Sequence, residues 1–473
     1  MYKLLFHLLI FSSVPYLIDA DDNSSTVPPT VNQTASTQNS EATGSTTVSP
    51  TVNCTTVPTT PGKWYASSQV LYLNKLVAGS KKVMSDIEPG SQLYLASNDD
   101  IENLRNISIS SGTVNITLDE LYDLDSNGKP KNFTITDTLT IFVQDANLNM
   151  TNLTGVYYIT TKEQAQDPTF HVYVIKTKHN ITSSDDSNGT FIILNTQLIN
   201  FHKEDSDAPQ KNSFVSGIVQ PETSVLWFHW GLPSATNGGE ANRFFANPVK
   251  LGTESRFFTH IEPLQVPLDY WHFRSFGKFD LTIENRYQRS QVYTTTGIDT
   301  TGIVINNGKY FEHNVKFLNM SIKSRTSGAV ISTFPSSKDF INFTFSDNFG
   351  ASNSASFNNE SKETHSILST TIQATKLTIS STSYTPGKFY CQYYGYSGDL
   401  LPTTQGTTVK TTQGSTTVVA DKSTVSTTPG STVTTVTTTT SATTTIGTTT
   451  AGGSGQFSIF VWFLVFSLFS VQE

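Results

Sequence analysis

The chain has 473 residues, of which 36% are hydrophobic and 14% charged, and its formal net charge at pH 7 is −8. Acidic charge that is spread without runs offers no surface to a phosphate backbone, which excludes nucleic acid as a partner. The length allows two domains, and a single large β domain is the alternative.

Residues 1–20 predict a secretory signal peptide. Lys3 supplies the positive start, an apolar stretch follows, and Ala20 is a small residue suited to the position before cleavage. Pro15 breaks the apolar stretch, which is also too short to span a membrane. The mature chain would begin at Asp21, in an oxidising compartment.

Two low-complexity stretches flank the remainder, residues 21–60 and 402–454. The first is rich in Ser, Thr and Pro, and between 403 and 450 the second has 29 Ser or Thr among 48 residues. Such segments have too little apolar surface to offset the entropy of ordering, so both are expected to be disordered. The C-terminal stretch is typical of an O-glycosylated stalk.

Asn-x-Ser/Thr sequons indicate heavy N-glycosylation and surface exposure at each asparagine. No sequon lies between residues 188 and 319. The candidate sites are Asn23, Asn32, Asn53, Asn106, Asn115, Asn132, Asn149, Asn152, Asn180, Asn188, Asn319, Asn342 and Asn359.

The part between the stalks has the pattern of short β-strands. Runs such as "SQLYLAS", "LTIFVQ", "GVYYITT", "FHVYVIK", "GTFIILN", "KFDLTIENRY" and "KLTIS" alternate in polarity and are separated by Gly, Asn, Asp and Ser. They predict an all-β protein built of tandem antiparallel sandwiches. The charged stretch 202–213 is the predicted boundary between domains at 63–200 and 214–394.

The stretch without sequons between residues 188 and 319, called here the sugar-free window, contains two aromatic clusters, "LWFHWG" and "DYWHF". One interpretation is a binding face or a site in which histidine works with Asp269 or Glu262 in acid–base roles. The other is that strand alternation buries these side chains in the core. The candidate face consists of Trp227, His229, Trp230, Tyr270, Trp271 and His272.

No motif for a nucleophile, a metal or a phosphate occurs, so no catalytic residue, metal or cofactor is expected. The acidic stretches "DDIENL" (99–104) and "LDELYDLD" (118–125) lack the pattern of a calcium loop, and solvated surface is the preferred interpretation.

Nearly identical hexapeptides, "TPGKWY" (60–65) and "TPGKFY" (385–390), lie near the two cysteines. Pro-Gly predicts a turn that leads into a strand. Cys54 and Cys391 are expected to form a disulfide in an oxidising compartment, and an intermolecular bond or two free thiols are the alternatives.

The apolar run 457–471 is followed only by Gln472 and Glu473. It is short for a spanning helix and has no basic anchor, so it predicts a GPI signal, with a short membrane anchor as the alternative. Spacer length favours attachment at Gly447, within the triplet 447–449, over Ser441 and Gly452.

The layout of signal peptide, β-rich core, Thr-rich stalk and apolar tail resembles the nematode CUB-like family of secreted and surface proteins. The aromatic segment "GKFYCQYYGY" (387–396) is similar to the final strand of a CUB domain. The chain departs from that family in its cysteines, since CUB domains carry two local disulfides each, and the family's calcium site cannot be placed. The resemblance implies a CUB-like or jelly-roll sandwich and a role in surface defence or response to microbes.

Together these features predict a GPI-anchored or secreted, non-enzymatic surface glycoprotein. Its partners would be the outer leaflet, through the lipid, and an extracellular protein or glycan. A secreted hydrolase-like enzyme and a structural surface-coat glycoprotein are the alternatives.

Overall fold

A computed structural model describes residues 65–184, 188–201, 209–234, 239–252, 254–288, 292–295, 299–307, 312–318, 325–335, 340–358, 360, 365–369, 374–381 and 387–397. Contacts divide the chain into residues 1–409 and 410–473, and all described residues belong to the first unit. The predicted signal peptide, segment 21–60, stalk and apolar tail lie outside the described residues, as do the attachment candidates Ser441, Gly447 and Gly452.

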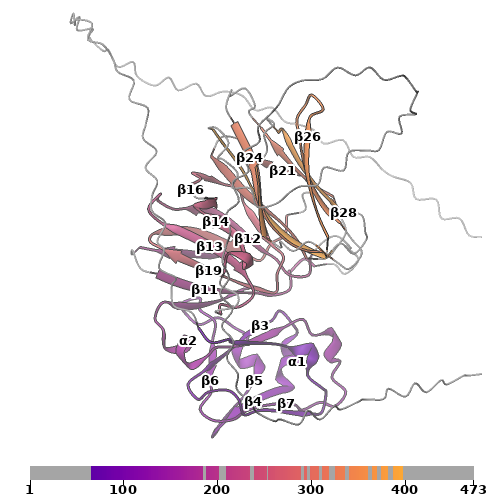
Figure 1. The fold of residues 1–473 in the computed structure, drawn as a ribbon. Helices are drawn as coiled ribbons and strands as arrows, with labels where there is room; N and C mark the ends of the chain where they lie inside the picture. Colours follow the sequence, from indigo (N-terminus) through magenta and orange to yellow (C-terminus); the bar gives the residue numbers. More distant parts are fainter. Residues whose placement is uncertain are drawn as a thin grey trace, which may run out of the picture. The chain divides into compact units, whose positions relative to one another are not determined.

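Strands dominate the described residues, and the protein is all-β as predicted (Figure 1). Each of the seven alternating runs contains a strand. The helical elements are short: α1 (Ile101–Arg105), α2 (Lys162–Gln166), η1 (Leu73–Lys75), η2 (Leu118–Leu121), η3 (Met150–Asn152) and η4 (Glu240–Asn242).

Two four-stranded antiparallel sheets form the N-terminal part. The first has the order β1-β8-β3-β6, with bounds Gln69–Tyr72, Val156–Ile159, Gln92–Ala96 and Asn132–Thr134. The second has the order β2-β7-β4-β5, with bounds Lys81–Met84, Leu139–Val143, Ile107–Ser111 and Val114–Thr117.

The two-residue period of these strands places their apolar side chains in one core cluster. In β7 the side chains of Leu139, Ile141 and Val143 are buried, whereas Phe142 between them is exposed. Leu93 and Leu95 of β3 join the same cluster from the other sheet.

Two further sheets follow in the chain. One has the order β10-β20-β12-β18, with bounds His179–Ser183, Phe279–Glu284, Ser213–Val219 and Leu264–Val266. The other has the order β14-β13-β19-β11-β9, with bounds Arg243–Asn247, Val225–Trp230, Tyr270–Phe276, Asn188–Asn195 and Phe170–Ile175. A stacked aromatic core with Phe191, Phe228 and Phe273 belongs to this part of the chain.

The last strands form a pair of five-stranded sheets and one hairpin. The first sheet has the order β17-β22-β29-β24-β27, with bounds His260–Ile261, Thr300–Asn307, Gly387–Ser397, Arg325–Pro335 and His365–Ser369. The second has the order β21-β23-β28-β25-β26, with bounds Val292–Thr295, His313–Phe317, Lys376–Ser381, Ile341–Ser346 and Ser352–Phe357. The hairpin joins β15 (Val249–Leu251) to β16 (Glu254–Arg256).

The sheets are not purely antiparallel, which corrects one detail of the prediction. Strand β9 pairs with β11 in parallel, and so do β17 with β22 and β21 with β23. Parallel neighbours require a crossover, and between β9 and β11 the chain crosses over through β10, which belongs to another sheet. This topology does not establish the tandem CUB-like or jelly-roll sandwich.

The predicted boundary at 202–213 does not divide the strand pairing. Strands β10 and β11 precede it but pair with β20 and β19, which follow it. Gln197 and Lys211 form an antiparallel bridge, so the two ends of the connection between them lie side by side. Strands β1 to β8 pair only among themselves, and the strands from β9 onward pair only with one another. The division in strand pairing therefore falls between β8 and β9.

The segment that resembles a final CUB strand is β29, which lies centrally between β22 and β24. The strand begins at Gly387, the glycine of the Pro-Gly pair, whose φ of 86° is the positive value expected of it. The predicted strand is present there, whereas the residues of the predicted turn before Gly387 lie outside the described ranges. Of the first hexapeptide copy only Tyr65 is described, and it precedes β1.

Candidate functional site

The six residues of the predicted binding face lie on two neighbouring strands, β13 and β19. Antiparallel pairing sets Trp230 opposite Trp271 and His229 opposite His272. Because successive side chains alternate between the faces of a sheet, these two pairs point to opposite sides. The structure therefore brings the six residues together without making them one face.

Trp271 belongs to the core, with 0% of its surface exposed. Its ring contacts Phe228 and Phe273, and its indole nitrogen donates a hydrogen bond of 3.2 Å to Ser213 Oγ. Strand β19 is buried almost throughout because it is central in its sheet and both of its faces are covered. The core interpretation is correct for this residue, and the binding-face interpretation is wrong.

His229 and His272 form a stacked pair with ring centroids 4.9 Å apart and are 1% and 0% exposed. His272 Nδ1 lies 2.9 Å from the carbonyl oxygen of Gly231, whereas neither nitrogen of His229 has a hydrogen-bond partner among the described residues. Burial lowers the pKa of His272 to about 4 and that of His229 well below its usual value. Both rings are therefore neutral near pH 7 and sealed from any solvent-borne substrate.

The carboxylates proposed to work with these histidines lie elsewhere. After burial, the groups that lower the pKa of His229 are His272, Arg243 and Arg274, all of them cationic when charged. Asp269 binds Tyr72 and Lys211, and the backbone of Glu262 bonds to Thr301. The predicted acid–base grouping is not assembled.

The remaining three residues of the predicted face are half-buried. Trp230 stacks on Tyr390 of β29 with centroids 4.2 Å apart, and Trp227 packs edge-on against Phe276. Tyr270 packs against a buried cluster that also contains Ile192 and Leu194. Large aromatic rings here join strands to one another.

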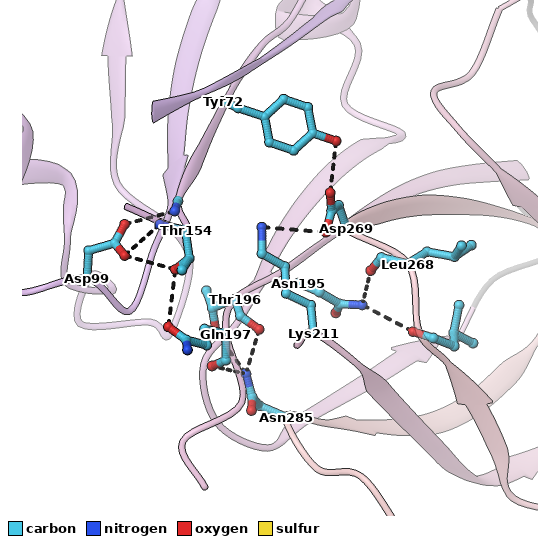
Figure 2. A network of polar contacts seen from close by, with 12 residues as sticks. Tyr72, Asp99, Thr154, Asn195, Thr196, Gln197, Lys211, Leu268, Asp269 and Asn285 are labelled. Atoms are coloured by element: carbon cyan, nitrogen blue, oxygen red, sulfur yellow. Dashed lines mark hydrogen bonds and ion pairs between the residues drawn. The ribbon is translucent and has the colours of Figure 1, made fainter. Parts of the chain in front are cut away.

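Asp269 connects the first sheet to the strands that follow it, through a hydrogen bond to Tyr72 and an ion pair with the buried Lys211. Asp269 accepts a hydrogen bond of 2.8 Å from the Tyr72 hydroxyl, and its other oxygen lies 3.6 Å from Lys211 Nζ (Figure 2). Burial lowers the pKa of Lys211, while the nearby Asp269 opposes that shift. Tyr72, Lys211 and Asp269 are far apart in sequence, so this contact joins distant parts of the chain.

Amide side chains extend the polar contacts shown in Figure 2. Asn285 Nδ2 donates to the Thr196 hydroxyl oxygen at 2.8 Å. Asn98 Nδ2 donates to the same hydroxyl oxygen at 2.9 Å and to the carbonyl oxygen of Gln197 at 2.6 Å. Together they satisfy buried polar groups where the N-terminal sheets meet the later strands.

Asp99 corrects the prediction that the stretch 99–104 is solvated surface. Its carboxylate is buried and accepts hydrogen bonds from the Ser97 hydroxyl and from the backbone nitrogens of Thr154 and Gly155, at 2.7, 2.8 and 2.8 Å. The Thr154 hydroxyl also donates to it at 2.8 Å (Figure 2). The residues after Asp99 form α1, and the other acidic stretch begins with η2.

A cleft of about 180 Å³ lies beside β14. Its floor is a row of side chains directly opposite one another on three strands, Ile367 on β27, Val330 on β24 and Gln392 on β29. The Gln392 amide exchanges two hydrogen bonds of 2.8 Å with the backbone of Ala246, which fastens β14 to β29.

Four ionisable side chains line this cleft: Glu240, Arg243, Lys250 and His365. Glu240 Oε1 lies 3.1 Å from Lys250 Nζ and 3.7 Å from an Arg243 nitrogen. His365 Nδ1 lies 3.0 Å from the Ser332 hydroxyl, and burial together with Arg243 lowers its pKa, so its ring is neutral at pH 7.

Sequence reasoning missed the residues of this cleft. Of its four ionisable residues, three lie between residues 188 and 319, where no sequon occurs, but His365 is more than a hundred residues further on. No motif spacing joins them, because β24, β27 and β29 bring them together only in the fold. The absence of sequons was the one signal that pointed toward the region.

The described sequon asparagines are accessible, and none lies in the cleft lining. Asn106 and Asn342 are half-buried. The exposed ones are Asn115, Asn132, Asn149, Asn152, Asn180 and Asn188, while Asn23, Asn32, Asn53, Asn319 and Asn359 lie outside the described residues.

Cys391 is 0% exposed, and burial raises the pKa of its thiol. Its neighbours across the sheet are Val304 and Ile331, and all three belong to one core cluster. Cys54 lies outside the described residues, so the Cys54–Cys391 disulfide stays a prediction.

Residues 88–468 match the family described as transmembrane glycoprotein, and the chain belongs to that family. The description places it among glycoproteins of a membrane or surface. The matched family is not the CUB-like one, so the comparison gives no support to the CUB-like resemblance or to the defence role that it implies. No curated protein matches the chain.

Within the described ranges, no helix is both long enough and apolar enough to cross a membrane. The apolar run 457–471 lies outside those ranges.

Proposed function

We propose that the chain presents a ligand-binding extracellular part at the cell surface, with the cleft beside β14 as its binding site. The observation that carries this proposal is a hollow lined by Glu240, Arg243, Lys250 and His365, with no sequon asparagine among its lining residues. Concave sites with a few converging polar groups on an apolar floor are where proteins bind small ligands.

Binding is favoured over hydrolysis by the placement of the histidines. His229 and His272 are sealed in the sheet, and the acid–base partners proposed for them bind other groups. A catalytic base has to lie within hydrogen-bond reach of the proton it removes, and a sealed ring does not meet that condition.

The test uses cells that express the full chain and are offered labelled extracellular glycans and proteins. Val330→Arg fills the floor of the cleft, so ligand capture should fall to background while the amount of protein at the surface stays unchanged. Val219→Arg, at an exposed position of β12, is the matched control and should leave capture intact.

If Val330→Arg lowers the surface level, Lys250→Glu replaces it, because Lys250 is an exposed side chain of the same cleft. Undiminished capture by a well-expressed cleft variant would contradict the proposal. It would favour the structural-coat alternative, in which the exposed sequons carry the function.

We also propose a GPI anchor attached at Gly447, with Ser441 and Gly452 as the alternative sites. Support comes from the short apolar run 457–471 without a basic anchor. Phosphatidylinositol-specific phospholipase C should release the protein from intact cells. Retention would reject the lipid anchor and favour a membrane-spanning one, as in the family's description.

A further inference from the structure

Positive charge is in excess in the cleft beside β14. Arg243 and Lys250 both approach the same oxygen, Oε1 of Glu240, at 3.7 and 3.1 Å. The single negative charge of Glu240 is therefore shared between two positive charges. The neutral ring of His365 adds no charge near pH 7, so the cleft holds about one uncompensated positive charge.

The Arg243 guanidinium has hydrogen-bonding capacity to spare. Among the described residues, Glu240 lies 3.7 Å away, which is too long for a hydrogen bond, and the Trp227 ring centroid lies 5.3 Å away. A guanidinium carries five donors in a planar fork that matches a carboxylate. This side chain is 13% exposed and lines the cleft, so a ligand there can reach its donors.

The rest of the cleft suits a small ring with hydroxyl groups. Val330 and Ile367 give an apolar floor, and Phe244 and Val249 add apolar surface beside it. The volume of about 180 Å³ far exceeds the ~10–15 Å³ that one water requires. His365 bonds to Ser332 through Nδ1, which leaves Nε2 available to a ligand.

From this arrangement we infer that the cleft binds a carboxylate-bearing monosaccharide unit, such as a uronic acid. The sugar carboxylate would pair with Arg243 and Lys250, the ring would lie on Val330 and Ile367, and hydroxyl groups would reach Glu240 and His365. This inference rests on the proposed function and specifies its ligand.

Calorimetric titration of the full chain, purified in detergent, tests the ligand class. Glucuronate should bind, whereas glucose lacks the charge and acetate lacks the ring, so each should bind at least about tenfold more weakly. Equal binding of acetate and glucuronate would overturn the inference in favour of a general anion site. Absence of glucuronate binding would also overturn it.

Two variants at exposed side chains of the cleft should act in opposite directions. Lys250→Ala removes a partner of the carboxylate and should weaken glucuronate binding several-fold. Glu240→Gln removes the competing negative charge and should strengthen it. The control is Lys178→Ala, which removes another exposed lysine that is paired with a glutamate, Glu284, at 4.0 Å. Weakened binding in Glu240→Gln would contradict the assigned geometry.

Arg243→Lys keeps the charge but loses the planar fork, and should weaken binding about tenfold at an unchanged melting temperature. Unchanged affinity in this variant would contradict the assigned role of Arg243. The two proposals can fail separately. If Val330→Arg abolishes ligand capture on cells but glucuronate does not bind, the cleft remains the site and only the sugar assignment falls.

Discussion

At the residue scale, Asp99 is a buried carboxylate on which four hydrogen bonds converge in the N-terminal part. Its carboxylate receives donors from Ser97, Thr154 and Gly155. Asp99→Ala leaves two backbone nitrogens and two hydroxyls without their acceptor. Because unsatisfied buried donors are costly, we expect the free energy of unfolding to fall by about 3 kcal/mol. Urea denaturation of the full chain measures this change.

The neighbouring residue provides the control for that substitution. Asp100 is exposed and its side chain makes no capping hydrogen bond to α1. Asp100→Ala should change the free energy of unfolding by no more than about 0.5 kcal/mol. Equal effects of the two substitutions would show that the Asp99 carboxylate does not hold this loop together.

At the element scale, β29 packs a tyrosine over a glycine on each of its neighbours. Tyr393 lies opposite Gly302 of β22, and Tyr394 lies opposite Gly328 of β24. A Cβ added at Gly328 would collide with the Tyr394 ring and with a backbone oxygen. Gly328→Ala should therefore lower the free energy of unfolding by about 2 kcal/mol, measured by urea denaturation.

Gly239→Ala is the control, since nothing lies within 4 Å of a Cβ built there and its φ is −73°. This substitution should have little effect on the same measurement. If Gly328→Ala is equally harmless, the tyrosine of β29 does not need the space.

The two buried histidines of β13 and β19, His229 and His272, should make the folded protein less stable in mild acid. The folded state lowers the pKa of His229 and His272, so below about pH 6.5 the unfolded chain binds more protons than the folded one. Stability is full above about pH 6.5. It falls by about 1.4 kcal/mol per pH unit for each histidine as the pH drops toward the folded value, which is about 4 for His272.

His229→Phe isolates one member of the pair. His229 makes no hydrogen bond, so a phenyl ring should cost little at pH 7.5 and should remove about 1.4 kcal/mol per pH unit of the acid slope. Urea denaturation at pH 7.5, 6.5 and 5.5 measures both quantities. An acid slope identical to that of the natural chain would contradict a neutral, buried His229.

At the scale of the whole molecule, sequence patterns predicted strands better than their partners. Period-two runs such as "LTIFVQ" identified β7 because one face of its sheet packs in the core. The same rule gave no answer for Trp271, because β19 is covered on both faces. The cleft was beyond sequence reasoning, since Arg243 and His365 become neighbours only through the pairing of β24, β27 and β29.

We expect the contact of Tyr72, Lys211 and Asp269 to contribute to how cooperatively the described part unfolds. Lys211 is buried and its carboxylate partner is Asp269, 3.6 Å away. Asp269→Ala removes both the acceptor of the Tyr72 hydroxyl and the counter-charge of the lysine. Because an unpaired buried charge is costly, we expect a loss of about 3 kcal/mol and an earlier unfolding of the N-terminal sheets.

Calorimetry of the full chain should then show two transitions where the natural chain shows one. Asp280→Ala, at an exposed position of β20, should leave a single transition. Lys211→Met in the Asp269→Ala background removes the buried charge and should recover part of the lost stability. If Asp269→Ala still unfolds in one transition at the natural temperature, the Asp269 contacts do not couple these sheets.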